Sequence, residues 1–183
     1  MTETPDAQHE VRGTLSTLRI IVISLVMGVS IFLGYALATA SGDAEKEPML
    51  WTIMAGFAGM ALLARAVVPG FVFSTIRRKI SQGNWQPTSK NRGPVPKTDE
   101  GLLMAALQMK TILGCAILEA PGFANGYAYM TERQPASFAI ALALILLIAA
   151  HFPLRFWLDG WLQRQIKWIE EDRQLRPASG NNT

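Results

Sequence analysis

The sequence predicts an all-α integral membrane protein with four transmembrane helices, and three observations support this class. Half of the 183 residues are hydrophobic and 17% are charged, below the roughly 25% that is typical of soluble domains. Four apolar stretches are each long enough to cross a bilayer core, which takes about 20 residues of helix. Basic residues concentrate in alternate segments between these stretches, as they do in multi-pass proteins.

The apolar stretches are expected to be helical because lipid offers the backbone no hydrogen-bond partners. In chain order they cover residues 20–39, 49–73, 111–130 and 136–157. Ala38-Thr39-Ala40 resembles a signal-peptide cleavage site, but the first apolar run is longer than the roughly 7–15 residues of a signal peptide, which favours an uncleaved anchor. A helical turn or two from Thr98 is expected before the third span, and Pro153 is expected to kink the fourth.

Polar segments flank a predicted four-helix membrane domain at residues 15–175. Residues 1–14 and 176–183 are expected to be disordered. The loop at 74–100 is expected to be irregular, since its second half is rich in proline and glycine. A helical extension at 158–175 places tryptophans beside basic residues, a pattern typical of anchors at a membrane interface.

The distribution of Lys and Arg predicts the orientation. The segment before the first span, the loop at 74–100 and the C-terminal segment are rich in basic residues, whereas the two other loops carry only Lys46 and Arg133. Positively charged loops stay in the cytoplasm. Both termini and the long middle loop are therefore expected to be cytoplasmic, with the chain in the cytoplasmic membrane.

The first and third spans share a local pattern. Gly34-Tyr35-Ala36 and Gly126-Tyr127-Ala128 lie near their outer ends, and Arg19 and Lys110 lie at their inner ends. Either an internal repeat or chance resemblance between transmembrane helices explains this pattern. An internal repeat predicts two parallel helical hairpins.

Glu119 is an acid within an otherwise apolar or small stretch of the third span. On a helix, the side chains of Gln108, Cys115, Glu119, Gly122 and Gly126 fall within about 60° of one another. The two glycines are four residues apart, which allows another helix to approach closely. Glu119 is therefore expected to face a neighbouring helix, and Cys115 to be a packing residue.

A charge at the bilayer centre costs about 2.5 kcal/mol or more, so Glu119 is expected to be protonated or to pair with a cation. Arg65 and Gln108 are the candidate partners, although Arg65 and Lys110 are expected to reach the cytoplasmic interface. Pro121 has no N–H, which leaves the carbonyl of Ile117 without its helical partner. With Asn125 one turn further on, Glu119 is a candidate site for a proton or a small cation.

The stretch from Thr111 to Pro121, TILGCAILEAP, resembles the carboxylate-bearing helix of the rotary ATP synthase c subunit. In that family a helix of small residues bears a membrane-central acid followed closely by proline, and Glu119 and Pro121 fall on these positions. The resemblance is local: Arg65 in the preceding span, a longer loop and two further spans depart from the family. It implies that Glu119 titrates or binds an ion.

The sequence contains no P-loop, no dinucleotide fingerprint and no nucleophile–base pattern, so we expect no enzyme activity and no cofactor or metal. The favoured function is a structural or accessory membrane component with a buried carboxylate at a helix interface. The alternative is proton or cation translocation through Glu119. The expected partners are the lipid bilayer and either a second copy of the chain or another membrane subunit, and no nucleic acid is expected.

Overall fold

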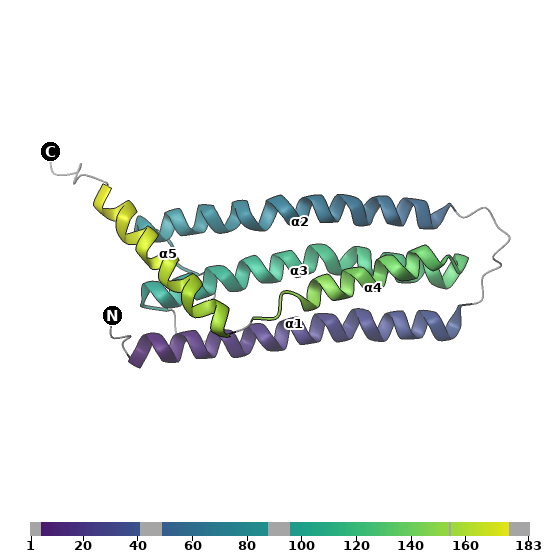
Figure 1. Ribbon diagram of the computed structural model, residues 1–183, viewed down its shortest axis with the longest axis horizontal. Helices are drawn as coiled ribbons and strands as arrows, with labels where there is room; N and C mark the ends of the chain where they lie inside the picture. The colour runs from purple at the N-terminus through teal and green to yellow at the C-terminus, as the bar shows by residue number, and fades with distance from the viewer. Residues whose placement is uncertain (1–4, 41–48, 88–95, 154, 176–183) are drawn as a thin grey trace. The chain divides into compact units, whose positions relative to one another are not determined.

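The computed structural model describes residues 5–40, 49–87, 96–153 and 155–175, with side chains described from Glu10 onward and not at 155–157. These residues form five α-helices and no strand, which confirms the all-α class (Figure 1). The helices are α1 (Pro5–Thr39), α2 (Leu50–Ser81), α3 (Asp99–Glu132), α4 (Pro135–Ala149) and α5 (Arg155–Leu175).

Three of the helices, α1, α2 and α3, are long and apolar enough to cross a membrane, which indicates a membrane location. The fourth apolar helix is shorter: α4 has 15 residues, about 22 Å at 1.5 Å per residue, against about 30 Å for a bilayer core. The four expected crossings are thus matched by three helices of full length and one short helix.

The helix expected at 136–157 is interrupted, because the chain leaves the helical conformation between α4 and α5. The end of α4 tightens into three-residue turns, in which His151 N–H donates to the carbonyl of Ile148 (3.0 Å) and Phe152 N–H to that of Ala149 (3.0 Å). Pro153 has no N–H and disfavours a helical conformation at Phe152. The kink expected at Pro153 is therefore a break, and a new helix begins at Arg155.

The structure describes helix from Pro5, within the segment expected to be disordered, and also at both ends of the loop expected at 74–100. The start of α1 is held by Leu15, which is buried, and by Glu10, which accepts hydrogen bonds from Thr98 Oγ1 (2.7 Å) and Lys97 N–H (3.1 Å). Thr98 in turn caps α3, because its hydroxyl accepts a bond from Gly101 N–H (3.0 Å). The predictions for residues 1–4, 88–95 and 176–183 lie outside the described residues.

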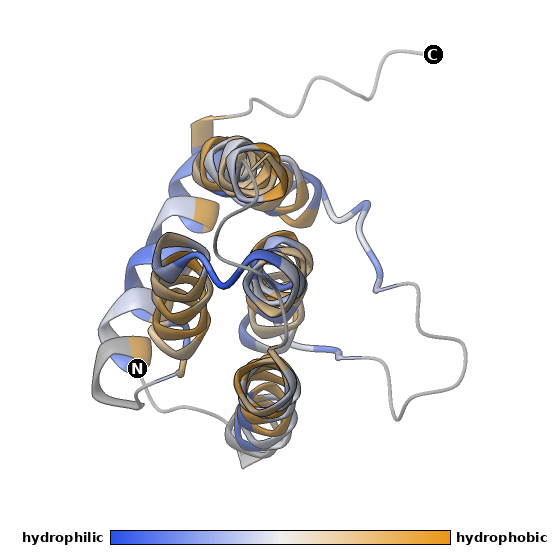
Figure 2. Cartoon of the chain, turned by 90° about the vertical axis from the view of Figure 1, so that its right-hand side faces the viewer, coloured by the Kyte–Doolittle hydropathy of each residue, from blue (hydrophilic) through white to orange (hydrophobic). Residues whose placement is uncertain are grey.

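The chain divides into two compact units. Unit 2 comprises residues 19–70 and 111–152, so it contains most of α1, α2 and α3 and all of α4. Within this unit α3 and α4 lie between α1 and α2 (Figures 1 and 2). Half of the apolar window of α3 is buried, compared with 22% for α1 and for α2. The central helix of unit 2 is therefore α3, and the apolar outer faces belong mainly to α1 and α2.

Unit 1 comprises residues 1–18, 71–110 and 153–183, and it has a core of its own. Leu158, Trp161, Leu162 and Ile169 on one face of α5 are buried in that core. Trp161 packs against Phe73, with 5.6 Å between the ring centroids, and Arg77 lies over the ring of Trp168 at 3.7 Å. The apolar face of α5 is therefore packed on protein within unit 1, and the role of these tryptophans as interfacial anchors stays a prediction.

Candidate functional site

The residues predicted to form a site lie mainly on α3 in unit 2. Asn125 is completely buried, and Glu119 is partly buried. Among the described residues Glu119 makes no hydrogen bond or ion pair, so its role as a proton or cation site stays a prediction. Gln108, its candidate partner, is partly buried and belongs to unit 1.

Asn125 joins α3 to α2. Its side-chain amide donates hydrogen bonds to the carbonyls of Met54 (3.1 Å) and Pro121 (2.9 Å). The first bond crosses between helices, which is how polar side chains hold transmembrane helices together. The Asn125 oxygen is buried and has no hydrogen-bond partner among the described residues. The Asn125 nitrogen therefore bonds helix to helix, whereas the Asn125 oxygen accepts no hydrogen bond from the described residues.

Gly122 and Gly126 lie where α1 approaches α3. A methyl group added at Gly122 would lie 3.1 Å from Val29 Cγ1, and one added at Gly126 would lie 3.0 Å from Phe32 Cε1. Phe32 also meets Phe123 edge to face, with 5.2 Å between the centroids. The absence of side chains at both glycines therefore lets α1 pack directly against the backbone of α3.

Arg65 reaches into unit 2 between α2, α3 and α4. A methyl group added at Gly114 would lie 2.9 Å from Arg65 Nε, so the guanidinium stem rests on the surface of α3. Arg65 Nη2 contacts Nε2 of His151, at the end of α4. Cys115 is buried in the core of unit 2, and both Arg65 and Glu119 are close enough to its thiol to interact with it electrostatically. The expectation that Arg65 reaches the cytoplasmic interface stays a prediction.

The turn between α3 and α4 contains a pair of charges that the sequence analysis did not identify. The Glu132 carboxylate accepts hydrogen bonds from the N–H groups of Leu50 (2.7 Å) and Trp51 (2.9 Å), at the start of α2. Arg133, whose φ is 52°, donates to the carbonyl of Ala40, at the end of α1. A helix leaves its first N–H and last C=O groups without partners. Its N-terminus is stabilised by a negative charge and its C-terminus by a positive charge. Glu132 and Arg133 thus cap two different helices.

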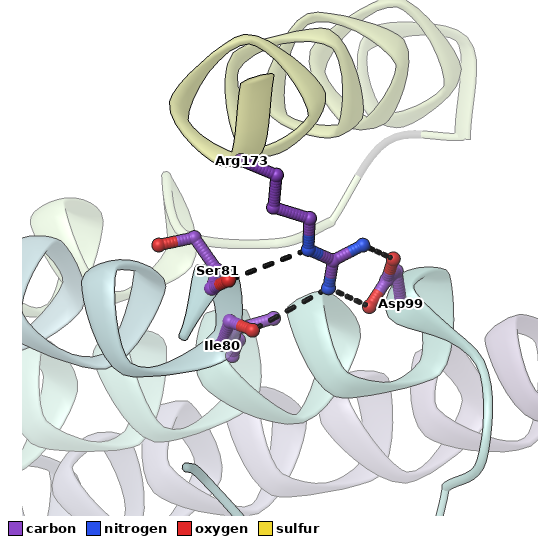
Figure 3. A network of polar contacts seen from close by, with 4 residues as sticks. All are labelled: Ile80, Ser81, Asp99 and Arg173. Carbon is purple, nitrogen blue, oxygen red and sulfur yellow. Dashed lines mark hydrogen bonds and ion pairs between the residues drawn. The ribbon is translucent and has the colours of Figure 1, made fainter. Parts of the chain in front are cut away.

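A second capping network lies in unit 1, on α5 (Figure 3). The Arg173 guanidinium forms two bonds with the Asp99 carboxylate (2.7 and 3.0 Å), at the first turn of α3. It also donates to the carbonyls of Ser81 (3.4 Å) and Ile80 (3.5 Å), at the end of α2. The bond to Asp99 raises the pKa of Arg173, which stabilises its charged form. The Ser81 hydroxyl donates to Asp172 (2.6 Å). One turn of α5 therefore satisfies the ends of two helices.

Comparisons with protein-family models, with curated proteins and with solved structures found no match. Within the described ranges, the structure also contains no group of three or more His, Cys, Asp or Glu side chains that could hold a metal ion. The interpretation of the site therefore depends on the contacts given above.

Replacing Gly126 with valine is expected to lower the free energy of unfolding by about 1–3 kcal/mol, because the new side chain collides with Phe32. Unfolding of the detergent-solubilised protein, followed by tryptophan fluorescence, measures this change. Gly59→Val is the matched control, since an added methyl there meets nothing within 4 Å. Equal losses for the two variants would contradict close packing at Gly126.

Replacing Glu132 with alanine is expected to lower the free energy of unfolding by about 0.5–2 kcal/mol, the usual effect of losing a helix cap. In hydrogen–deuterium exchange, the amides of Leu50 and Trp51 should exchange faster, since they lose their acceptor. Glu171→Ala, at an exposed position of α5, is the control. Unchanged exchange at Leu50 and Trp51 would show that Glu132 does not cap α2.

Proposed function

We propose that the chain is a four-pass protein of the cytoplasmic membrane, in which unit 2 crosses the bilayer and unit 1 lies on the cytoplasmic side. The lengths of the helices support this division. The parts of α1, α2 and α3 in unit 2 are 19–39, 50–70 and 111–132, each about 31–33 Å long at 1.5 Å per residue, close to the roughly 30 Å of a bilayer core. The remaining turns of these helices belong to unit 1.

Contacts within unit 1 support a fourth crossing. The start of α3 is bonded to α5 through Asp99 and Arg173, so the chain enters α3 and returns to α5 within the same unit. If α3 crosses the membrane, the chain must cross back before α5, and α4 with residues 150–152 is the segment available. Glu10 near the start of α1 accepts a hydrogen bond from Thr98, and Ser81 at the end of α2 donates one to Asp172 of α5. The start of α1 and the end of α2 therefore lie on the same side of the membrane as α5.

The distribution of charge supports the cytoplasmic assignment of unit 1. In the sequence of unit 2, the Lys and Arg residues are Arg19, Lys46, Arg65 and Arg133, and all the others belong to unit 1. Because basic segments stay on the cytoplasmic side, both termini and the segment between α2 and α3 are assigned there.

We infer that the protein is a structural or accessory component of this membrane. One observation carries this proposal: the polar side chains inside unit 2 connect helices to one another. Asn125 bonds α3 to α2, Glu132 caps α2, Arg133 caps α1, and Arg65 bonds α2 to His151. The outer faces of α1 and α2 expose large apolar side chains, which suits contact with lipid or with a membrane partner.

The second candidate function is proton or cation translocation through Glu119. Two observations favour it: Glu119 has no hydrogen bond or ion pair among the described residues, and the buried Asn125 oxygen on the same helix is an unused acceptor. The resemblance of the Thr111–Pro121 stretch to the carboxylate-bearing helix of the ATP synthase c subunit adds to this candidate.

Single cysteines at Asn84 and Ala136, in a Cys115→Ser background, test the four-pass arrangement. A membrane-impermeant maleimide should label position 84 from the cytoplasmic side and position 136 from the opposite side, since both residues are exposed and lie at opposite ends of α3. A third cysteine at Glu171 should behave like the one at Asn84. Labelling of positions 136 and 171 from the same side would overturn the fourth crossing.

Glu119→Gln separates the two candidate functions. For an accessory component, proteoliposomes with wild-type protein and with Glu119→Gln should dissipate an imposed pH or sodium gradient at the same rate as empty liposomes. Glu171→Gln, which changes an exposed acid of α5, controls for the loss of one charge. A flux that appears with the wild type and disappears with Glu119→Gln alone would replace the accessory proposal with the second candidate.

A further inference from the structure

His151 is held between a permanent cation and a backbone carbonyl. Its Nδ1 lies 2.7 Å from the carbonyl oxygen of Leu147, and its Nε2 meets Nη2 of Arg65. A carbonyl oxygen only accepts and a guanidinium only donates. The imidazole must therefore carry its proton on Nδ1 and present the lone pair of Nε2 to Arg65, which makes it neutral.

Protonation of His151 would replace this hydrogen bond with a contact between two cations. The guanidinium of Arg65 stays charged in proteins, so it has no means of relieving the repulsion. Among the described residues, the neighbouring helices also carry Arg19 on α1, which lies over the ring of Phe152 at 5.7 Å, and Cys115 and Glu119 on α3. Arg65 is the charged group whose contact with the imidazole is described.

The contact between His151 and Arg65 lies just after the end of α4, where few backbone hydrogen bonds hold the chain. His151 lies two residues after Ala149, the last residue of α4. The backbone N–H groups of Ala150, His151 and Phe152 each donate one hydrogen bond to a carbonyl three or four residues earlier, and Pro153 prevents the helix from continuing. The side chain of His151 connects this turn to α2 through Arg65.

We propose that the Arg65–His151 contact is an acid-sensitive latch: protonation of His151 releases the turn that follows α4, residues 150–152, from α2. This inference concerns regulation and goes beyond the proposed function. It depends on the contact alone, so it stands or falls separately from the number of crossings and from the role of Glu119. The charge of a histidine ordinarily changes between about pH 5 and 8; because Arg65 opposes a positive charge on His151, release is expected toward the acid end of this range.

Hydrogen–deuterium exchange of the protein in nanodiscs tests the latch. Exchange at residues 150–152 is compared with exchange at 144–146 in α4, which removes the common effect of pH on amide exchange, and Arg65→Gln, which keeps His151, controls for the effect of the charged imidazole on its neighbouring amides. Between about pH 7.5 and 5, the ratio of the two rates should rise about tenfold in the wild type, the effect of losing one hydrogen bond. In His151→Gln the ratio should not change with pH, because the amide oxygen accepts from Arg65 at any pH.

Nitrogen NMR of histidine-labelled protein with His9→Gln, in which His151 is the remaining histidine, measures the protonation state directly. The neutral form with the proton on Nδ1 is expected at pH 7.5, and the doubly protonated form at pH 5. In Arg65→Gln the exchange ratio should lose most of its pH dependence. The latch is overturned by the other tautomer at pH 7.5, by a His151 that stays neutral at pH 5, or by an unchanged exchange ratio once His151 is charged.

Discussion

Close packing against α3 is the constraint on which the rest of unit 2 depends. Gly122 and Gly126 receive Val29 and Phe32 from α1, and Gly114 receives the stem of Arg65 from α2. In lipid, helices gain little by burying apolar surface against one another, so close van der Waals contact and hydrogen bonds must hold them together. Small residues on α3 allow the close van der Waals contact, and Asn125 provides a hydrogen bond to the backbone of α2.

Helix ends are the other place where polar groups stabilise this chain. Glu132 and Arg133 satisfy the start of α2 and the end of α1, and Arg173 satisfies the end of α2 while it pairs with Asp99 at the start of α3. An exposed ion pair alone contributes little to stability. The contribution of Arg173 comes from serving two helix ends with one rigid guanidinium, whose charge suits the negative end of α2.

The helical class and three of the spans were predictable from the sequence, because the length and hydropathy of a stretch are local properties. The inward face of Gly122 and Gly126 also followed from helical periodicity. The break after α4 was underestimated, since a single proline either kinks or ends a helix according to its surroundings.

The contacts that define the site were harder to predict, because each joins residues far apart in the chain. Glu132 and Arg133 look like ordinary turn residues until the ends of α1 and α2 are placed beside them. The contact between His151 and Arg65 depends on how α2 and α4 pack. The burial of Trp161 on protein could not be predicted either, because a pattern of aromatic and basic residues suits a helix on lipid and a helix on protein equally well.

The pair at Glu132 and Arg133 has a consequence for how the chain is connected. The end of α1 and the start of α2 are both bonded to the turn between α3 and α4, although α1 and α2 are consecutive in the sequence. Two neighbouring residues of one turn therefore fix the ends of two other helices. Adding one residue beside Arg133 displaces both attachments together.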